Sequence, residues 1–190
     1  MKNFNFSREH LPVVILDTLE REDLVIAEIG VEYGGYTDIY YPILKKSKIY
    51  LIDLWKTEGN DYYFSNNPGQ VEDGYKKIIE KYNDAKNVTI CKGYSSDWAL
   101  NFEDEFFDWI YIDADHTTEA VLSDLKYWYP KLKKGGIISG HDYHADPSNK
   151  DYSYFGVDEA VNSFFKDVID DVHLTNEQYY KTWAYIKPEE

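Results

Sequence analysis

Acidic and histidine side chains follow two apolar runs in the second half of the chain. Asp113, Asp115 and His116 come directly after one run, and His141 and Asp142 come directly after the next. Parallel strands end at the same edge of their sheet, which is where open α/β sheets bind ligands. The spacing therefore predicts that these side chains converge. Two carboxylates and a histidine could hold a divalent cation, or a histidine could act as a general base that a carboxylate orients.

Two functional interpretations of this cluster stay open from the residues alone. In the first, Asp113, His141 and Asp142 bind a metal that lowers the pKa of a bound hydroxyl, although histidine is a poor ligand for magnesium. In the second, no metal binds and either His116 or His141 is the general base. A structural interpretation is that Asp115 and His116 only cap the helix that follows.

A second set of residues, in the first third of the chain, is typical of nucleotide binding. The apolar run Leu24–Ile29 is followed by Gly30 and by the pair Gly34-Gly35, which let the backbone turn sharply against a ligand. The next apolar run ends in Asp53, where an acid can accept hydrogen bonds from both hydroxyls of a ribose. Glu28 interrupts an apolar run, so we expect it to bond to the glycine loop or to the amino group of a cofactor.

Strand and helix patterns alternate along the chain and position both sets. The predicted strands are Leu24–Ile29, Lys48–Asp53, Asn87–Cys91, Phe106–Ile112, Ile137–Gly140, Val168–Leu174 and Thr182–Ile186. The predicted helices are Ser7–Thr18 with Ser7 as its cap, Gly35–Leu44, Gln70–Tyr82, Ser96–Leu100, Thr117–Tyr129 and Gly156–Phe165. This order predicts an α/β fold with a seven-stranded, mostly parallel sheet, helices on both faces and a C-terminal antiparallel hairpin.

Two long stretches, 55–74 and 143–155, separate these elements. Loops of this length in a compact domain are usually functional or disordered, and we expect the first to be a lid because it is rich in aromatic residues. Trp55 could stack near an adenine or only anchor that lid. We expect residues 1–190 to form a single domain, with an N-terminal helical segment at 1–22 and a core at 24–187.

Composition narrows the class of partner. The formal charge is −15 and the pI is about 4.7, which argues against nucleic acid or an anionic membrane as a partner, since both need basic surface. We therefore expect a small-molecule substrate, and a homodimer is compatible with the sequence. The chain shows neither the long apolar core of a signal peptide nor a membrane span, which predicts a cytoplasmic protein.

Several other titratable residues are expected to have structural or solvent roles. The single cysteine, Cys91, lies within an apolar run and is predicted to be a buried structural thiol. His10, Glu119, Asp124 and His144 are predicted to be solvated surface groups.

The ordered landmarks resemble class I S-adenosylmethionine-dependent methyltransferases, which have a Rossmann-like sheet, from Leu24 to about Lys187. They are Glu28-Ile29-Gly30 with Gly34-Gly35, Asp53, Gly93-Tyr94-Ser95-Ser96, Asp113 and Lys134-Gly135-Gly136. The G-x-G-x-x-G spacing that dinucleotide dehydrogenases usually carry is absent. More narrowly, the chain resembles macrocin-type small-molecule O-methyltransferases at Tyr111-Ile112-Asp113-Ala114-Asp115-His116, Asp124, Leu132 to Gly136, Gly140-His141-Asp142-Tyr143, Gly156-Val157 and Ala160-Val161.

The resemblance implies methyl transfer from S-adenosylmethionine to a small molecule, more often at a hydroxyl than at nitrogen or carbon. It implies cofactor contacts from Glu28, Gly30, Gly34, Asp53, Leu54, Trp55, Gly93, Tyr94, Ser95, Ser96 and Asp113. It implies a catalytic role for Asp113, His116 and His141. Catechol O-methyltransferase and the macrocin-type enzymes place magnesium at the ends of these strands, on Asp-Asp or Asp-Asn where this chain has His141-Asp142. The alternatives are a nicotinamide-dependent oxidoreductase and a catalytically inactive cofactor-binding interaction protein.

Overall fold

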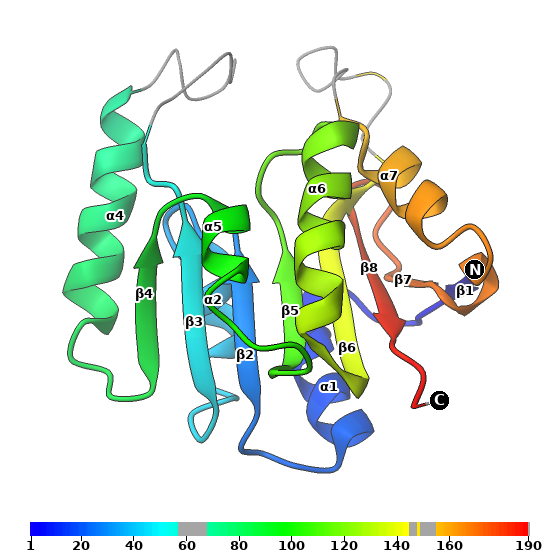
Figure 1. The fold of residues 1–190 in the computed structure, drawn as a ribbon, viewed down its shortest axis with the longest axis horizontal. Coiled ribbons are helices and arrows are strands. Elements are labelled where there is room, and N and C mark those ends of the chain that lie inside the picture. The colour runs from blue at the N-terminus through cyan, green and yellow to red at the C-terminus, as the bar shows by residue number, and fades with distance from the viewer. Residues whose placement is uncertain (57–67, 145–147, 149–154, 190) are drawn as a thin grey trace.

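A computed structural model describes residues 1–56, 68–144, 148 and 155–189, with the backbone alone for 68–71. Its strands are β1 (Lys2–Asn3), β2 (Val25–Ile29), β3 (Lys48–Asp53), β4 (Val88–Lys92), β5 (Phe107–Ile112), β6 (Leu132–Tyr143), β7 (His173–Leu174) and β8 (Lys181–Ile186). Its helices are α1 (Leu11–Leu19), α2 (Gly35–Tyr40), α4 (Pro68–Tyr82), α5 (Ser95–Ala99), α6 (Thr118–Trp128) and α7 (Val157–Phe164). Figure 1 shows how these helices flank one sheet.

The strands form one mixed sheet in the order β1-β7-β8-β6-β5-β2-β3-β4. From β6 to β4 all neighbouring strands run parallel. The strand β8 is inserted between β6 and β7 and is antiparallel to both, so the predicted C-terminal hairpin is confirmed. Parallel strands bring the ends of β2, β3, β4, β5 and β6 to one edge, which is the upper edge in Figure 1.

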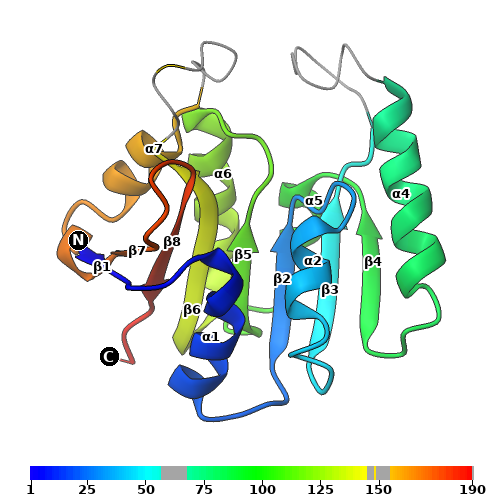
Figure 2. The same cartoon turned by 180° about the vertical axis from the view of Figure 1, so that it is seen from behind.

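Helices cover both faces of the sheet, as predicted. In Figure 1 α5, α6 and α7 lie in front of the strands, and Figure 2 shows α1 and α2 on the opposite face. The strand β5 is buried on both sides because its side chains alternate between two cores. Trp109 and Tyr111 face the core with α1, α2 and α4, whereas Ile110 and Ile112 face the core with α5, α6 and α7. Cys91 is buried, as predicted.

The N-terminal segment adds an eighth strand, β1. This strand has only two residues, which is too short for a strand pattern to be recognised in the sequence. The strand β1 pairs in parallel with β7. The amide of Lys2 donates to the carbonyl of Val172 at 3.0 Å, and that of Phe4 donates to Leu174 at 2.7 Å. The segment before α1 is thereby held along the outer side of the C-terminal hairpin, as Figure 2 shows.

Four predicted element boundaries were wrong. The predicted strand Ile137–Gly140 is the longer β6, Leu132–Tyr143, because Leu132 already pairs with Phe107 of β5. The predicted strand Val168–Leu174 shrinks to β7 because Ile169–Asp171 forms a 3₁₀ turn. The predicted helix Ser7–Thr18 is a 3₁₀ turn followed by α1, and the Ser7 hydroxyl bonds to the Glu9 carboxylate at 2.5 Å instead of capping a backbone amide. The helix α2 ends at Tyr40, before the predicted Leu44.

Two further predictions concern loops and membranes. Most of the predicted lid at 55–74, and most of the loop 143–155, lie outside the described residues. Among the helices in the described part of the chain, none is long and apolar enough to cross a membrane.

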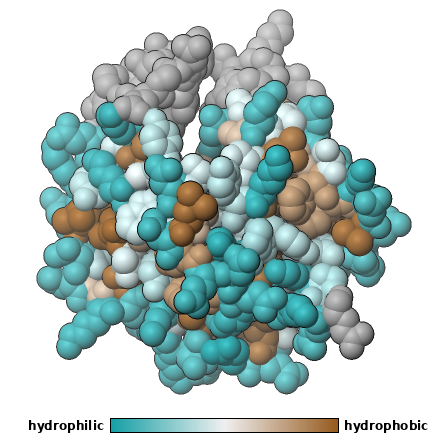
Figure 3. Space-filling model, viewed as in Figure 1, coloured by the Kyte–Doolittle hydropathy of each residue, from teal (hydrophilic) through white to brown (hydrophobic). Residues whose placement is uncertain are grey.

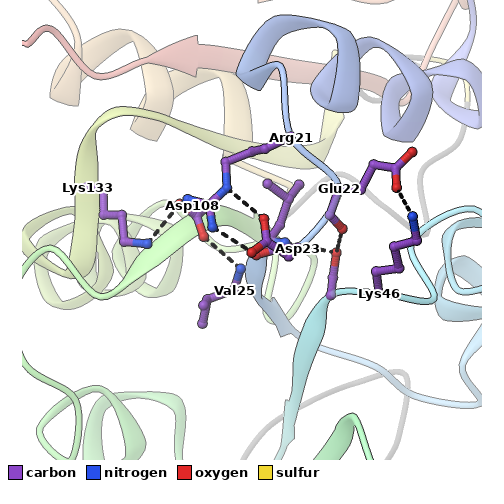
Figure 4. A network of polar contacts seen from close by, with 9 residues as sticks. Arg21, Glu22, Asp23, Val25, Lys46, Asp108 and Lys133 are labelled. Carbon is purple, nitrogen blue, oxygen red and sulfur yellow. Dashed lines mark hydrogen bonds and ion pairs between the residues drawn. The ribbon is translucent and has the colours of Figure 1, made fainter.

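A buried carboxylate secures the opposite edge of the sheet. Asp108 is 5% exposed and accepts a hydrogen bond from the amide of Val25 at 2.7 Å. Its other oxygen pairs with Arg21 at 3.2 Å and with Lys133 at 2.8 Å, as Figure 4 shows. This carboxylate therefore joins β5 to the start of β2 and to the turn that begins β6. Removing it would leave a backbone amide and two cations without their shared partner.

We expect Asp108→Ala to lower the free energy of unfolding by about 2–4 kcal/mol, because a buried hydrogen-bonded charge network loses its centre. Urea denaturation measures this change. Asp104→Ala is the matched control, since Asp104 is exposed and pairs only with Lys131 among the contacts of the described residues. The control should change the unfolding free energy by about 0.5 kcal/mol or less. Equal losses in the two variants would contradict the role given to Asp108.

Candidate active site

The strand β2 ends at the upper edge and is followed by a turn that begins with Gly30. Gly30 has a φ of +85°, a left-handed conformation that glycine adopts without strain. A Cβ atom at this position would lie 2.0 Å from the carbonyl oxygen of Asp113. The glycine loop and the end of β5 are therefore in backbone contact, and any larger residue would force them apart. Gly34, with a φ of +77°, then begins α2.

Asp53 is the acid that organises this loop. One of its carboxylate oxygens accepts hydrogen bonds from the amides of Val31 and Glu32, both at 2.8 Å. The other accepts from the amide of Trp55 at 2.7 Å. A carboxylate has about four acceptor directions, so three are used here and about one remains for a ligand. The predicted ribose-binding residue thus also shapes the loop that would hold the cofactor.

Two neighbouring segments complete the rim of the same site. The indole nitrogen of Trp55 donates to the carbonyl of Glu32 at 2.9 Å, and the side chain is 4% exposed. Trp55 thus anchors the glycine loop. The amide of Gly93 donates to the backbone carbonyl of Asp53 at 2.9 Å, which ties the loop after β4 to the end of β3. Tyr94 is half exposed at this rim.

Glu28 does not bond to the glycine loop, so that part of the prediction was wrong. Its carboxylate is 1% exposed and accepts hydrogen bonds from the hydroxyls of Thr37 at 2.5 Å and Tyr40 at 2.6 Å, both on α2. Burial raises the pKa of Glu28 to about 8, although the two hydroxyl donors oppose that rise. Glu28 is therefore mostly protonated at neutral pH and fixes α2 against β2.

The chemistry-bearing residues converge at the ends of β5 and β6, as predicted. Nε2 of His116 lies 3.0 Å from Oδ2 of Asp142 and 3.6 Å from Oδ1 of Asp113. Nδ1 of His141 lies 3.2 Å from the same oxygen of Asp142 and 4.0 Å from Oδ1 of Asp113. All four side chains are partly buried, so their charges interact more strongly than surface charges would.

A bulge in β6 explains how two consecutive residues reach one site. In a regular strand, neighbouring side chains point to opposite faces. The register between β6 and β8 shifts between Gly140 and Tyr143, and Asp142 has a φ of +59°. This irregular backbone turns His141 and Asp142 toward Asp113 together. A strained, non-glycine conformation of this kind is often found at functional sites.

The two carboxylates set the charge of His116. Burial alone would lower the pKa of His116, but contacts with Asp113 and Asp142 outweigh burial and raise it to about 10. The 3.0 Å contact with Asp142 has the distance of an ion pair without the alignment of a hydrogen bond. The two histidines in turn hold the pKa of Asp142 well below its usual range, against the effect of burial. His116 is thus a cation at neutral pH in this arrangement.

The structural interpretation of the cluster holds for one residue. Asp115 is exposed and accepts a hydrogen bond from the amide of Thr117 at 2.8 Å, so it does cap the turn before α6. His116 does not cap the helix; its ring stacks on Phe155 with centroids 4.3 Å apart. Thr117 is the cap residue of α6, and its hydroxyl accepts from the amide of Ala120 at 3.4 Å.

Arg8 is a site residue that the sequence did not reveal. Its guanidinium donates to Oδ2 of Asp113 at 2.7 Å and lies 4.3 Å from the ring centroid of Tyr36. The amide of Arg8 donates to the Glu177 carboxylate at 2.6 Å. The N-terminal segment therefore places a cation beside Asp113, which lies 105 residues further along the chain. No local pattern in the sequence could have signalled this contact.

Asp124 is not the solvated helix charge that was predicted. It is 8% exposed, lies on the side of α6 that faces α5, and accepts a hydrogen bond from the hydroxyl of Ser95. Burial raises the pKa of Asp124 to about 6, opposed by the Ser95 hydroxyl. The other three surface predictions, for His10, Glu119 and His144, are confirmed.

The donor set at the ends of β5 and β6 fits a divalent cation. One ligand atom each from Asp113, His141 and Asp142 lies within 4.8 Å of the others. Carboxylate oxygens suit magnesium, calcium and manganese, and an imidazole shifts the preference toward manganese and other transition metals. Oδ1 of Asp113 faces this set while its Oδ2 is held by Arg8.

Comparison with known proteins bears on both the fold and the family. A family model described as a methyltransferase domain matches residues 27–143. An uncharacterized protein from Acanthamoeba polyphaga mimivirus is 29% identical over 165 residues, which are 84% of this chain and 67% of that protein.

Solved structures share the fold at low identity. A protein described as an rRNA methylase from Clostridium thermocellum has a TM-score of 0.64 at 16% identity, covering 98% of each chain. One described as a caffeoyl-CoA O-methyltransferase from Staphylococcus aureus has a TM-score of 0.64 at 17% identity, covering 96% of this chain and 84% of that one. Spermidine synthase from Thermotoga maritima has a TM-score of 0.59 at 18% identity, and this chain spans 59% of its length.

The buried Glu28 predicts a pH-dependent difference in stability between the wild type and Glu28→Gln. Because the pKa of Glu28 rises from 4.5 to about 8 on folding, its stabilising contribution is complete below pH 4.5 and is lost as the pH rises through about 8. The unfolding free energy of the wild type should therefore fall relative to Glu28→Gln by roughly 2–3 kcal/mol between pH 6 and pH 8.

Urea denaturation at several pH values measures this difference. Glu22→Gln is the control, because Glu22 is exposed and pairs with Lys46 at the surface. Parallel stability profiles for the wild type and Glu28→Gln would show that Glu28 is ionised in the folded protein.

Proposed function

Because this chain belongs to the methyltransferase domain family, we propose that it transfers the methyl group of S-adenosylmethionine to a hydroxyl of a small molecule. The observation that carries the proposal is the convergence of Asp113, His116, His141 and Asp142 beside a glycine loop organised by Asp53. The cluster of Asp113, His116, His141 and Asp142 can remove a proton from an acceptor. The glycine loop can hold an adenosine. Backbone contact between Gly30 and Asp113 places the two side by side.

The residues of the loop fit the cofactor. Gly30 and Gly34 present backbone without side chains, and Asp53 keeps an acceptor direction for a ribose hydroxyl. We propose that the rim formed by Leu54, Trp55 and residues 93–96 bounds the adenine. When bound, the cofactor supplies an electrophilic methyl group, so the protein has to align the acceptor and exclude water. The partly buried edge near Asp113 suits both tasks.

The acceptor must lose a proton as its oxygen is methylated. We propose that Asp113, His141 and Asp142 hold a divalent cation, which lowers the pKa of a bound hydroxyl. While Asp113 and Asp142 face His116, its raised pKa argues against His116 as the base, because a protonated imidazole cannot accept a proton. In the competing mechanism no metal binds, and the base is either His141 or a His116 that has first lost its carboxylate partners.

The charge of the chain supports a small acceptor over a nucleic acid. A net charge of −15 would repel a phosphate backbone. On the face shown in Figure 3, hydrophobic residues form small separate groups among hydrophilic ones. The aromatic ring of Phe155 stands beside His116, and the ring of Tyr180 lies with its centroid 6.3 Å from that of Phe155. Both rings could contact a ring of the acceptor.

Cofactor binding distinguishes this proposal from a nicotinamide-dependent oxidoreductase. We expect calorimetry to detect S-adenosylhomocysteine binding to the wild type and to show Asp53→Asn binding it tenfold to a hundredfold more weakly, since a charged acceptor for ribose is lost. Asp84→Ala is the control, because Asp84 is exposed before β4 at the opposite edge and should bind normally. Tight binding of NAD without S-adenosylhomocysteine binding would refute the methyltransferase proposal.

Metal binding can be tested without knowing the acceptor. We expect Mn²⁺ to bind the wild type in calorimetric titration, and Asp142→Ala to abolish that binding, because two ligands rarely hold a divalent cation tightly. Asp115→Ala is the control, as Asp115 is exposed and outside the donor set. A wild type that binds neither Mn²⁺ nor Mg²⁺ would exclude the metal and favour a histidine base.

A further inference from the structure

The hydroxyl of Ser95 is bonded on two sides by the same helix. It donates to the carboxylate of Asp124 and accepts a hydrogen bond from the indole nitrogen of Trp128 at 2.8 Å. Asp124 and Trp128 are four residues apart, so they lie one above the other on one face of α6. Trp128 is fully buried and Asp124 nearly so. The contact therefore joins α6 to the first residue of α5 inside the protein.

Ser95 belongs to a short segment that this contact helps to fix, together with the buried Ala99 of α5. The helix α5 is five residues long, and its N-cap residue, Tyr94, makes no side-chain capping bond. A helix this short is marginal without tertiary contacts. Upstream, the amide of Gly93 bonds to the carbonyl of Asp53. Residues 93–96 are thus held at one end by the acid that organises the glycine loop and at the other end by α6.

Holding Ser95 with the buried carboxylate of Asp124 costs free energy. A buried carboxylate is destabilising unless a cation or several donors compensate it. Among the described residues, no lysine, arginine or histidine forms an ion pair with Asp124. The nearby charge of Asp115 adds repulsion. An apolar residue at this position would pack against α5 at lower energy, but it would release the Ser95 hydroxyl.

We infer that Asp124 is a positioning residue for the cofactor, which acts through the Ser95 hydroxyl to fix the loop 93–96 at the adenine side of the site. The inference rests on the proposed function, in which this loop bounds the cofactor. Asp124 itself touches neither cofactor nor acceptor. It sets the place of the loop before the ligand arrives, so less conformational freedom is lost on binding.

A purely structural role for the same bonds makes a different prediction. If Asp124 only stabilises the packing of α5 on α6, its removal should lower the unfolding free energy and leave cofactor affinity as it was. If Asp124 positions the loop, affinity should fall by more than any equally destabilising change in α6 produces. The two variants Asp124→Ala and Ser95→Ala should also act through one contact, so their effects should not add.

The experiment is calorimetric titration of S-adenosylhomocysteine into the wild type, Asp124→Ala, Ser95→Ala and the double variant, with urea denaturation of each. We expect each single variant to bind about tenfold more weakly and the double variant to bind no more weakly than the single ones. Asp124→Asn retains an acceptor for the serine hydroxyl and should stay within about threefold of the wild type.

Val121→Ala is the matched control, because Val121 is buried on α6 and its truncation destabilises the helix packing without touching Ser95. It should lower the unfolding free energy and keep affinity within about twofold. Unchanged affinity in Asp124→Ala, or additive losses in the double variant, would overturn the positioning role. A wild type that binds no S-adenosylhomocysteine would instead overturn the proposed function, and the inference with it.

Discussion

The backbone contact between Gly30 and Asp113 is the constraint on which the site depends. A Cβ at residue 30 would lie 2.0 Å from the carbonyl oxygen of Asp113, so the strands β2 and β5 can end side by side only with glycine there. Through this contact the loop that Asp53 organises and the cluster around Asp142 share a boundary. The fold thus places the glycine loop next to the acidic and histidine side chains at the ends of β5 and β6.

Opposite charges face one another at the ends of β5 and β6, even though the chain as a whole is strongly acidic. The carboxylates of Asp113 and Asp142 face two imidazoles, and Arg8 closes the outer side of Asp113. A cation that enters must therefore compete with His116 for the two carboxylates. These charges already face opposite charges within the protein, so a cation that binds would exchange partners instead of meeting isolated charges.

Much of this arrangement could be predicted, because it depends on strand ends. A mostly apolar run such as 106–112, which only Asp108 interrupts, indicates a buried parallel strand, and the rule that such strands share an edge places Asp113 beside His141 and Asp142. The predictions failed where the orientation of a helix decides the outcome. Glu28 could have contacted the glycine loop or α2, and Asp124 could have faced water or Ser95. The outcome depends on how the neighbouring helix is rotated about its axis, which the sequence pattern does not determine. Arg8 was missed because its contact spans 105 residues.

The position of the N-terminal segment has a consequence for how the protein is made. Arg8 is held by Glu177, which is 169 residues further along the chain, and β1 pairs with β7. At typical elongation rates, roughly 10–30 s of synthesis separate the emergence of these partners from the ribosome. During that interval the central parallel strands can form while Asp113 still lacks its arginine. The contacts that hold Arg8 beside Asp113 are therefore complete only after Glu177 has emerged.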